Sequence, residues 1–404
     1  MDVLVGTGTA LQIGRTHGTQ MGGAVAMNLR SFWRRMAAGG WSRAEVLSCT
    51  RKQESRFLSD SRREEITGIA EGARLPYPEV LAYNLYYGLA YPDECTVMWA
   101  LRDATADGKT LFMKNSDKIG RADMVGTGFH MHKEINVVVA LRPQGKPAVI
   151  GVANAGSTGL KMGVNDRGVA AGTNIARTVE LRRRTVTTTQ ERAVDRAQLA
   201  RDGLEMDTAM DAAGAIVIRV AASPMETPGN VEFVDARRAV VIEGSYDRLA
   251  VHVYDSGTGS RTNRFVVLHE LNDPEDLSSY CRYVRTQQLL AGRQGRLTLD
   301  DFAGFTRDHA NGPGLNSICR HDPDFKSETT QSALVAAIDP ASPADTTVRI
   351  ALGKPCHAWE HADGHLEATL RFRPGDIPVA FRSGEVWKRY WTEAPAQTEP
   401  ATVR

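Results

Sequence analysis

Hydrophobic residues follow one spacing before Cys95 and a different spacing after it. Up to Cys95, apolar and charged side chains recur at the spacing of amphipathic helices, and strand-like runs are few. The spacing predicts helices over Ala24–Ala38, Arg43–Phe57, Arg62–Ala73 and Glu79–Leu89. We therefore predict that residues 1–94 form a mainly helical segment.

After this point, short apolar and β-branched runs are separated by Gly, Pro, Asp and Asn, which is typical of strands joined by turns. Strands are predicted over 95–101, 110–114, Ile135–Leu141, Pro147–Val152, Gly229–Ala236, Ala239–Glu243, Arg248–Tyr254, Gln331–Ile338 and Thr347–Leu352. Helices are predicted over Thr189–Ala213, Leu277–Ala291 and Leu299–Asp308. Two groups of strands separated by helices favour an α+β, four-layer αββα fold, with two stacked antiparallel sheets between helical layers. The same periodicity also fits an ordinary α+β pair of domains.

One cysteine stands at the start of a predicted hairpin. The run TVMWAL after Cys95 is mostly apolar, Asp107–Gly108 supplies a turn, and the run TLFM resumes the strand. Pairing of the two strands would bring Asp117 back to the end that carries Cys95. This proximity of a thiol and a carboxylate makes Cys95 the first candidate for a chemical role.

Composition narrows the classes of partner. The 404 residues include 49 Lys and Arg against 48 Asp and Glu, a formal charge of +1, which gives no electrostatic case for nucleic acid or a charged membrane surface. No apolar run reaches about 18 residues and the N-terminus lacks a signal-peptide pattern. We expect a soluble, cytoplasmic protein with a small-molecule or peptide partner. The tail 392–404, rich in Pro, Ala, Thr and Glu, is predicted to be disordered.

The cysteines and histidines do not form a metal-binding pattern in the sequence. The five cysteines are scattered and contain no CxxC pair, which argues against a disulfide framework or a zinc knuckle. His130 and His132 share a face of a predicted strand without a third ligand nearby, and His309, His321 and His357 are each isolated. Cys319 and Cys356 are interpreted as buried thiols. We expect no metal and no cofactor.

An ordered series of short motifs carries a family resemblance. The series is EEITGIAEGARLPYPEVLAYN (64–84), Cys95-Thr96, Asn115-Ser116-Asp117, GVNDRGVAAGTN (163–174), Gly229-Asn230, Thr262-Asn263-Arg264-Phe265, Ser317-Ile318-Cys319-Arg320-His321 and Leu352-Gly353-Lys354-Pro355-Cys356. From about Gly14 to Pro355 the chain resembles the acyl-coenzyme A:6-aminopenicillanic acid acyltransferase-like family of N-terminal-nucleophile hydrolases.

The resemblance implies self-cleavage within the αββα fold. The Cys95 thiol would attack the carbonyl of Glu94, and water would hydrolyse the thioester. A helical propeptide or small chain, 1–94, and a catalytic chain, 95–391, would remain associated. The α-amine freed on Cys95, with a reference pKa of about 8, would then act as the base for its own thiol. Homo-oligomerisation is left open.

The resemblance also implies roles for other residues. Asp117 would orient the Cys95 amine, and Arg320 would pair with Asp117 and keep it ionised. Asn230 would donate to the oxyanion that forms during attack. Supporting roles fall to Thr96, which would orient the amine or the scissile bond, to Asn115, which would satisfy backbone groups, and to Asn174, a structural residue or a weaker site candidate.

The sequence leaves several functions open. Hydrolysis would make the protein an amidohydrolase of a non-peptide or peptide-like amide, and we favour this because acyl transfer needs a site that excludes water. Transfer between an acyl-CoA or amide and an amine acceptor is the alternative. A dipeptidase-like relative would leave the first 94 residues unexplained. An uncleaved, non-catalytic binding protein is suggested by Glu94, where the family often has glycine.

Overall fold

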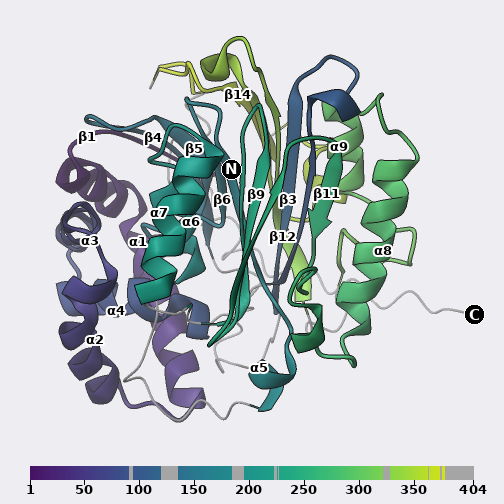
Figure 1. Ribbon diagram of the computed structural model, residues 1–404. Helices are drawn as coiled ribbons and strands as arrows, with labels where there is room; N and C mark the ends of the chain where they lie inside the picture. The colour runs from purple at the N-terminus through teal and green to yellow at the C-terminus, as the bar shows by residue number, and fades with distance from the viewer. Residues whose placement is uncertain are drawn as a thin grey trace, which may run out of the picture.

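Two β-sheets lie face to face between helical layers in the computed structural model of the chain (Figure 1). The structure describes residues 1–90, 94–119, 135–183, 195–222, 225, 227–321, 328–362, 364–373 and 375–377. The predicted tail, 392–404, and the histidines His130 and His132 lie outside the described residues.

The larger sheet has eight strands and the smaller has six, within the described residues. In spatial order the larger sheet contains β1 (Val3–Gly8), β4 (Asn136–Pro143), β5 (Val149–Asn154), β6 (Met162–Asn165), β7 (Ala170–Ile175), β8 (Gly229–Val234), β9 (Ala239–Gly244) and β10 (Leu249–Tyr254). The smaller sheet contains β11 (Thr258–Arg261), β2 (Glu94–Ala100), β3 (Thr110–Ile119), β12 (Glu328–Ile338), β13 (Thr347–Leu352) and β14 (His365–Thr369). Neighbouring strands are antiparallel except β1 and β4, which run parallel.

Helices cover the outer face of each sheet (Figure 1). On the larger sheet lie α1 (Ala10–Ala38), α2 (Arg43–Phe57), α3 (Asp60–Ala73), α4 (Tyr77–Ala90), α6 (Arg196–Gly203) and α7 (Ala209–Ala222). On the smaller sheet lie α8 (Leu277–Ala291) and α9 (Leu299–Phe305). The short helices are α5 (Val179–Arg183), α10 (Pro355–Ala358) and the 3-10 turns Arg102–Ala104, His269–Leu271 and Pro343–Asp345.

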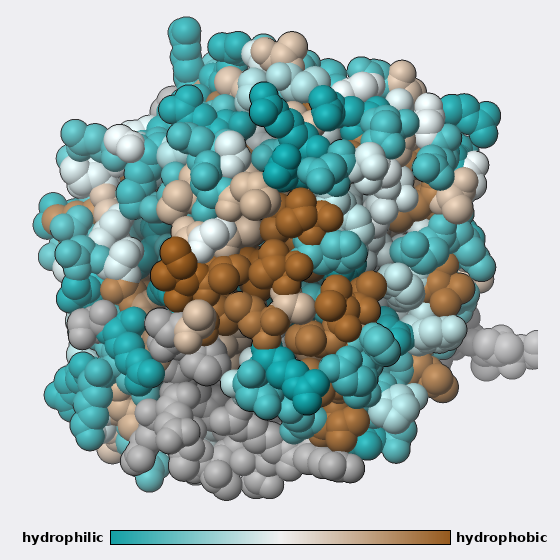
Figure 2. Space-filling view, viewed as in Figure 1, coloured by the Kyte–Doolittle hydropathy of each residue, from teal (hydrophilic) through white to brown (hydrophobic). Residues whose placement is uncertain are grey.

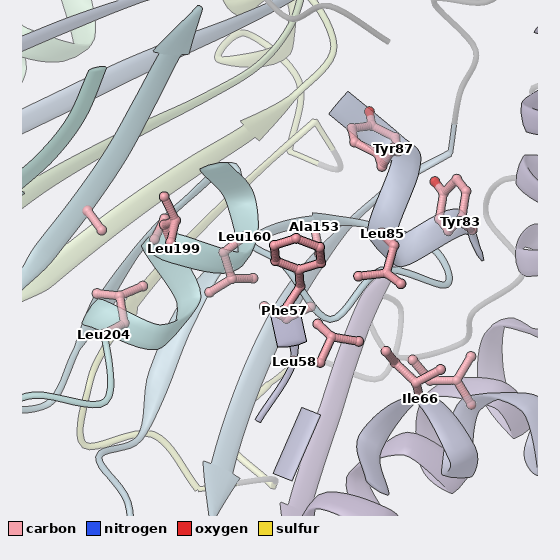
Figure 3. Packing of buried hydrophobic residues seen from close by; sticks show 14 of the residues in the cluster. Phe57, Leu58, Ile66, Tyr83, Leu85, Tyr87, Ala153, Leu160, Leu199 and Leu204 are labelled. Atoms are coloured by element: carbon pink, nitrogen blue, oxygen red, sulfur yellow. The ribbon is translucent and has the colours of Figure 1, made fainter. Parts of the chain in front are cut away.

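Separate hydrophobic clusters hold the layers together. The largest joins the helices to the outer face of the eight-stranded sheet, and Figure 3 shows Phe57, Ile66 and Leu199 among its members. A second, with Val97, Trp99 and Phe112, fills the space between the sheets, and a third lies under α8 and α9. The predicted four-layer αββα fold is thus confirmed.

The N-terminal segment is not only helical. The prediction missed β1, a short strand that pairs with β4 far along the chain. It also began α1 at Ala24, whereas the helix begins at Ala10, where Thr9 forms a capping box with Gln12. The segment before Cys95 therefore supplies an edge strand to the larger sheet.

Glycines let α1 and α3 approach closely. A Cβ atom on Gly14 would lie 2.0 Å from the carbonyl oxygen of Glu65, and one on Gly68 would lie 2.3 Å from that of Leu11. Gly18 and Gly72 extend the same contact. Backbone therefore packs against backbone along this crossing, an arrangement that small residues at four-residue spacing allow.

The helical cover ends before β10, the edge strand. Leu249, Val251 and Val253 on β10 remain 38%, 46% and 36% exposed, although their ladder partners include core residues of β9. Figure 2, in the orientation of Figure 1, shows apolar side chains gathered at the centre of the face of the molecule that it draws. Among the helices of the described ranges, none combines the length and apolar character needed to cross a membrane.

Candidate active site

Cys95 lies at the start of β2, in the middle of the molecule. The ladder pairs Cys95 with Ser116 and Glu94 with Asp117, so the predicted return of Asp117 to the thiol end of the hairpin is confirmed. Every residue of β2 is buried. Because side chains alternate along a strand, Cys95 shares the inner face with Val97 and Trp99, between the sheets, while Thr96 faces α8.

Two side chains hold the backbone on either side of the Cys95 α-carbon. The N–H of Cys95 donates to Asn263 Oδ1 at 3.2 Å, and Arg282 Nη1 donates to the Cys95 carbonyl oxygen at 2.9 Å. Arg282 Nη2 also donates to Asn263 Oδ1 at 2.7 Å, and Asn263 Nδ2 donates to the Ile175 carbonyl at 2.9 Å. The nitrogen of the Glu94–Cys95 peptide bond is therefore held in a fixed position.

Arg282 reaches this position from the buried face of α8. Asp276 caps the helix by accepting from Ser279 N, and Ser279, Arg282 and Thr286 follow at spacings that place them on one side. Arg282 is fully buried and also donates to Thr96 Oγ1 at 3.0 Å. The polar stripe of this helix thus faces β11 and the start of β2 instead of solvent.

Three arginines surround the Glu94 side chain among the described residues. Arg177 Nε donates to Glu94 Oε1 at 2.7 Å, Arg282 Nη2 lies 3.5 Å from Oε2, and Arg320 also forms an ion pair with Oε2. Burial alone would raise the pKa of Glu94, but Arg320, Arg177 and Arg282 outweigh it and hold that pKa well below its usual range. Glu94 is therefore a buried, ionised carboxylate.

Asp117 is fully buried beside Glu94 and accepts from Thr330 Oγ1 at 2.6 Å. Arg320 pairs with it as predicted, at 3.6 Å from Nη1 to Oδ2, while the same guanidinium also binds Glu94. Burial raises the pKa of Asp117, and Arg320 only partly offsets this rise. Arg320 favours the ionised form of Asp117 while removal from water opposes it, and the role of Arg320 in keeping Asp117 ionised stays a prediction.

The two predicted asparagines of the larger sheet are cross-strand neighbours, with Asn174 on β7 opposite Asn230 on β8. Asn230 Nδ2 donates to the carbonyl of Arg264 at 3.2 Å and lies 3.5 Å from that of Thr262. It therefore anchors the loop that carries Asn263, and its role at an oxyanion stays a prediction. Asn174 donates to the Arg261 carbonyl at 3.3 Å, or to Glu232 with its amide rotated by half a turn.

Asn115 is paired with Thr96 and lies on the face of β3 that points away from the larger sheet. It connects β3 to two later segments. Its Nδ2 atom donates to the carbonyls of Thr306 at 2.9 Å and Ile318 at 3.0 Å. The second contact lies two residues before Arg320. Asn115 thus binds the segment that carries Arg320, the residue that contacts Glu94 and Asp117.

The Cys95 thiol lies near polar groups buried between the sheets. Burial raises the pKa of this thiol, Lys114 counteracts the rise, and Asp117 adds to it. Lys114 Nζ donates to the Lys161 carbonyl at 2.5 Å and to Thr173 Oγ1 at 3.2 Å. Burial also raises the pKa of Glu232 to about 7. The thiol is thus protonated at neutral pH and needs a base before it can attack.

Sequence reasoning missed several of these residues. Asn263 stands in the motif 262–265 without a predicted role, and the predicted site does not include Arg177, Arg282, Lys114 or Glu232. For Lys114 and Glu232 a signal existed, since Lys114 directly follows the apolar run Leu111–Met113 and Glu232 stands between the apolar residues Val231 and Phe233 of a predicted strand. Arg282 similarly falls on the buried stripe of a predicted helix.

The prediction that His309, His321 and His357 are each isolated is wrong for His309 and His321. His309, Cys319, His321 and Cys356 come together beside the segment of Arg320, with one ligand atom from each within 4.8 Å of the others. Loops far apart in sequence meet here, which no local spacing could reveal.

No family model matches the sequence, and a search of curated proteins finds none similar to it. Among solved structures, the chain is similar to a Caenorhabditis elegans ortholog of N-acylethanolamine-hydrolyzing acid amidase, at 17% identity and a TM-score of 0.39, over 60% of this chain and 92% of that one. It is also similar to a mutant conjugated bile acid hydrolase from Clostridium perfringens, at 10% identity and a TM-score of 0.39, over 70% of this chain and 94% of that one. Penicillin V acylase from Agrobacterium tumefaciens is similar at 10% identity and a TM-score of 0.37, over 64% of this chain and 83% of that one. These likenesses are weak, and the layer order of the chain rests on its own strand pairing.

Proposed function

We propose that the chain is the precursor of an N-terminal-cysteine amidohydrolase that cleaves itself between Glu94 and Cys95. The observation that carries this proposal is the restraint on one buried peptide bond next to a thiol. Asn263 accepts from its nitrogen, Arg282 binds the following carbonyl, and arginines hold the Glu94 side chain. Such restraint keeps a reacting pair in an attack geometry.

Self-cleavage would proceed by an N-to-S acyl shift. The Cys95 sulfur bonds to the Glu94 carbonyl carbon, the bond from that carbon to the Cys95 nitrogen breaks, and the thiol proton ends on the nitrogen, which becomes an amine. Water then adds to the thioester, releasing a carboxylate on Glu94 and a free thiol on Cys95. Asn263 accepts from the nitrogen throughout, and Asp117 lies nearby to stabilise the protonated amine.

The mature enzyme would repeat this chemistry on a substrate. The free amine of Cys95 takes the thiol proton, the sulfur attacks the amide carbonyl, and the leaving amine departs with that proton. Water completes the cycle by hydrolysing the thioester. Because Cys95 is fully buried in the intact chain, displacement of Glu94 is also what would open a path to the thiol.

The arginines around Glu94 suggest the class of substrate. Glu94 provides the acyl group of the first thioester, and its side-chain carboxylate lies among Arg177, Arg282 and Arg320. A substrate acyl group occupying the same place would meet these guanidinium groups. We infer a preference for amides whose acyl part carries a carboxylate, at the spacing found in a glutaryl group.

The first experiment is the intact mass of the purified protein beside that of Cys95→Ala. Two chains in the wild type, with the larger beginning at Cys95, and one chain in the variant would support the proposal. A single chain in both would contradict it and favour an uncleaved binding protein. Cys281→Ser serves as the thiol control and should cleave like the wild type, because Cys281 lies outside the buried face of α8 that carries Arg282.

The substrate class is tested separately on the cleaved enzyme. Glutaryl-p-nitroanilide and its neutral counterpart, pentanoyl-p-nitroanilide, differ in the carboxylate alone. We expect kcat/KM to be about 10- to 100-fold higher for the glutaryl compound, the value of a charged hydrogen bond. Equal rates for the two compounds would contradict the carboxylate preference but would leave the proposed amide hydrolysis intact. The same assay with added hydroxylamine tests for acyl transfer, because an amine that attacks the thioester in place of water gives a hydroxamate.

A further inference from the structure

We propose that His309, Cys319, His321 and Cys356 form a tetrahedral binding site for a zinc ion. One ligand atom from each residue lies within 4.8 Å of the others. Cys319 Sγ is 3.7 Å from His321 Nε2, which is 3.2 Å from Cys356 Sγ. Zinc bound at about 2.3 Å to sulfur and about 2.0 Å to nitrogen separates its ligands by about 3.3–3.8 Å, close to this spacing.

The donor set selects the kind of metal. Two thiol sulfurs and two imidazoles suit zinc in a tetrahedral site, whereas Mg²⁺ and Ca²⁺ require oxygen ligands. The His309 Nε2 atom is buried and has no hydrogen-bond partner among the residues that the structure describes. A buried ring nitrogen without a partner beside two thiols is a group that a metal would satisfy.

The segments that carry the ligands are held together by contacts that do not involve the ligand side chains. The N–H of Cys319 donates to the Asp308 carbonyl at 3.1 Å, which places Cys319 beside His309. Trp359 Nε1, immediately after α10, donates to Thr306 Oγ1 at 2.9 Å and joins the helix of Cys356 to the same region. The four ligands are therefore largely preorganised.

Four protein ligands leave no open position, so the ion would be structural and not catalytic. Its place in the fold gives it a consequence for the candidate active site, because Cys319 and His321 flank Arg320. The Arg320 guanidinium contacts Glu94 and Asp117, while its two neighbours point to the metal site. The ion would fix the short segment from which Arg320 reaches the nucleophile end of β2.

The test uses Co²⁺ as a probe of the whole chain. The wild-type protein is reduced, stripped of metal by a chelator and titrated with Co²⁺ alone. We expect saturation at one equivalent, with thiolate-to-cobalt charge-transfer absorption and the intense visible bands of a tetrahedral site, and loss of both when Zn²⁺ is added. This readout is independent of self-cleavage and of hydrolysis, so it stands or falls apart from the proposed function.

Variants assign the ligands. Cys319→Ser and Cys356→Ser should weaken Co²⁺ binding by at least about 100-fold, more than the loss of an outer contact. His357→Gln and Cys281→Ser are matched controls, since His357 lies beside His321 but is exposed and outside the ligand set. They should bind like the wild type. The proposal is overturned if the reduced, folded wild type binds no stoichiometric Co²⁺ or Zn²⁺, or if Cys319 and Cys356 form a disulfide that zinc does not prevent.

Discussion

Glu94 and Asp117 lie directly opposite each other in the β2–β3 ladder, and the guanidinium of Arg320 contacts both carboxylates. Like charges at opposite ladder positions repel, so this pairing depends on the cations around it. The two groups respond differently, because the pKa of Glu94 is held below its usual range while burial raises that of Asp117. Departure of Glu94 after cleavage would leave Asp117 with the arginines.

Removal of the Glu94 carboxylate should be costly. In a Cys95→Ala background, which would exclude the proposed cleavage, we expect Glu94→Ala to lower the free energy of unfolding by about 3–5 kcal/mol, because it leaves buried guanidinium groups uncompensated. Urea unfolding measures this change. The control Glu71→Ala removes an ion pair with Arg15 in which both side chains are about half exposed, and should cost about 1 kcal/mol or less. Equal losses would mean that the arginines are not anchored by Glu94.

Asn263 should set the rate of self-cleavage. Its Oδ1 atom accepts from the Cys95 N–H. Asn263→Ala removes this hydrogen bond, so the Glu94–Cys95 peptide bond is held less firmly and cleavage should slow about 10- to 100-fold. The rate is followed by mass spectrometry of protein synthesised in vitro and sampled over time. Asn272→Ala is the control, since Asn272 makes equivalent bonds to the backbone of Phe265, away from Cys95. A slowing of similar size in both variants would reduce Asn263 to a loop anchor.

Glu232 should give stability a particular pH dependence. Burial raises its pKa to about 7 from 4.5, so between these values the folded chain binds a proton that the unfolded chain has released. The stabilisation from this proton is present at low pH and is lost as the pH rises towards 7. The comparison is made between two proteins that both carry Cys95→Ala, one with Glu232 and one with Glu232→Gln. Between pH 4.5 and about 7, the protein with Glu232 should lose up to about 3 kcal/mol more unfolding free energy than the Gln variant. A difference that is constant with pH would show that Glu232 stays ionised.

The crossing of α1 and α3 should not tolerate side chains. A Cβ atom on Gly68 would overlap the Leu11 carbonyl oxygen, so we expect Gly68→Ala to destabilise the fold by about 1–3 kcal/mol or more. Gly214 within α7 has no described atom within 4 Å of the position that a methyl group would occupy, and Gly214→Ala should stabilise by up to about 1 kcal/mol. Thermal unfolding of both variants checks the difference in sign.

Most of the helices and strands could be predicted because they follow from local patterns. Apolar spacing placed α2, α8 and β13 with their observed bounds, and the two strand-like runs on either side of Asp107–Gly108 predicted the hairpin that brings Asp117 to the start of β2. These features depend on neighbouring residues along the chain. Their prediction needed no knowledge of distant contacts.

The remaining parts of the site depend on tertiary contacts. Asn263 and Arg282 reach Cys95 from separate segments, and His309 meets Cys356 only when α10 folds against the end of α9. A lone polar residue carries no sign in the sequence of which partner it will meet. The pKa of Asp117 depends on burial, which is likewise a property of the whole fold and not of the neighbouring sequence.

Strand β1 gives a cleaved molecule a property that the intact chain lacks. Residues 1–94 would then be a separate chain, yet they contain an edge strand of the larger sheet and helices of its main core. Unfolding of the intact chain is unimolecular, whereas refolding after cleavage would require two chains to meet. Its apparent stability would then depend on concentration, and at high dilution each unfolding event would be final. Self-cleavage would in this way give each molecule a single folding event, completed before the free α-amine of Cys95 exists.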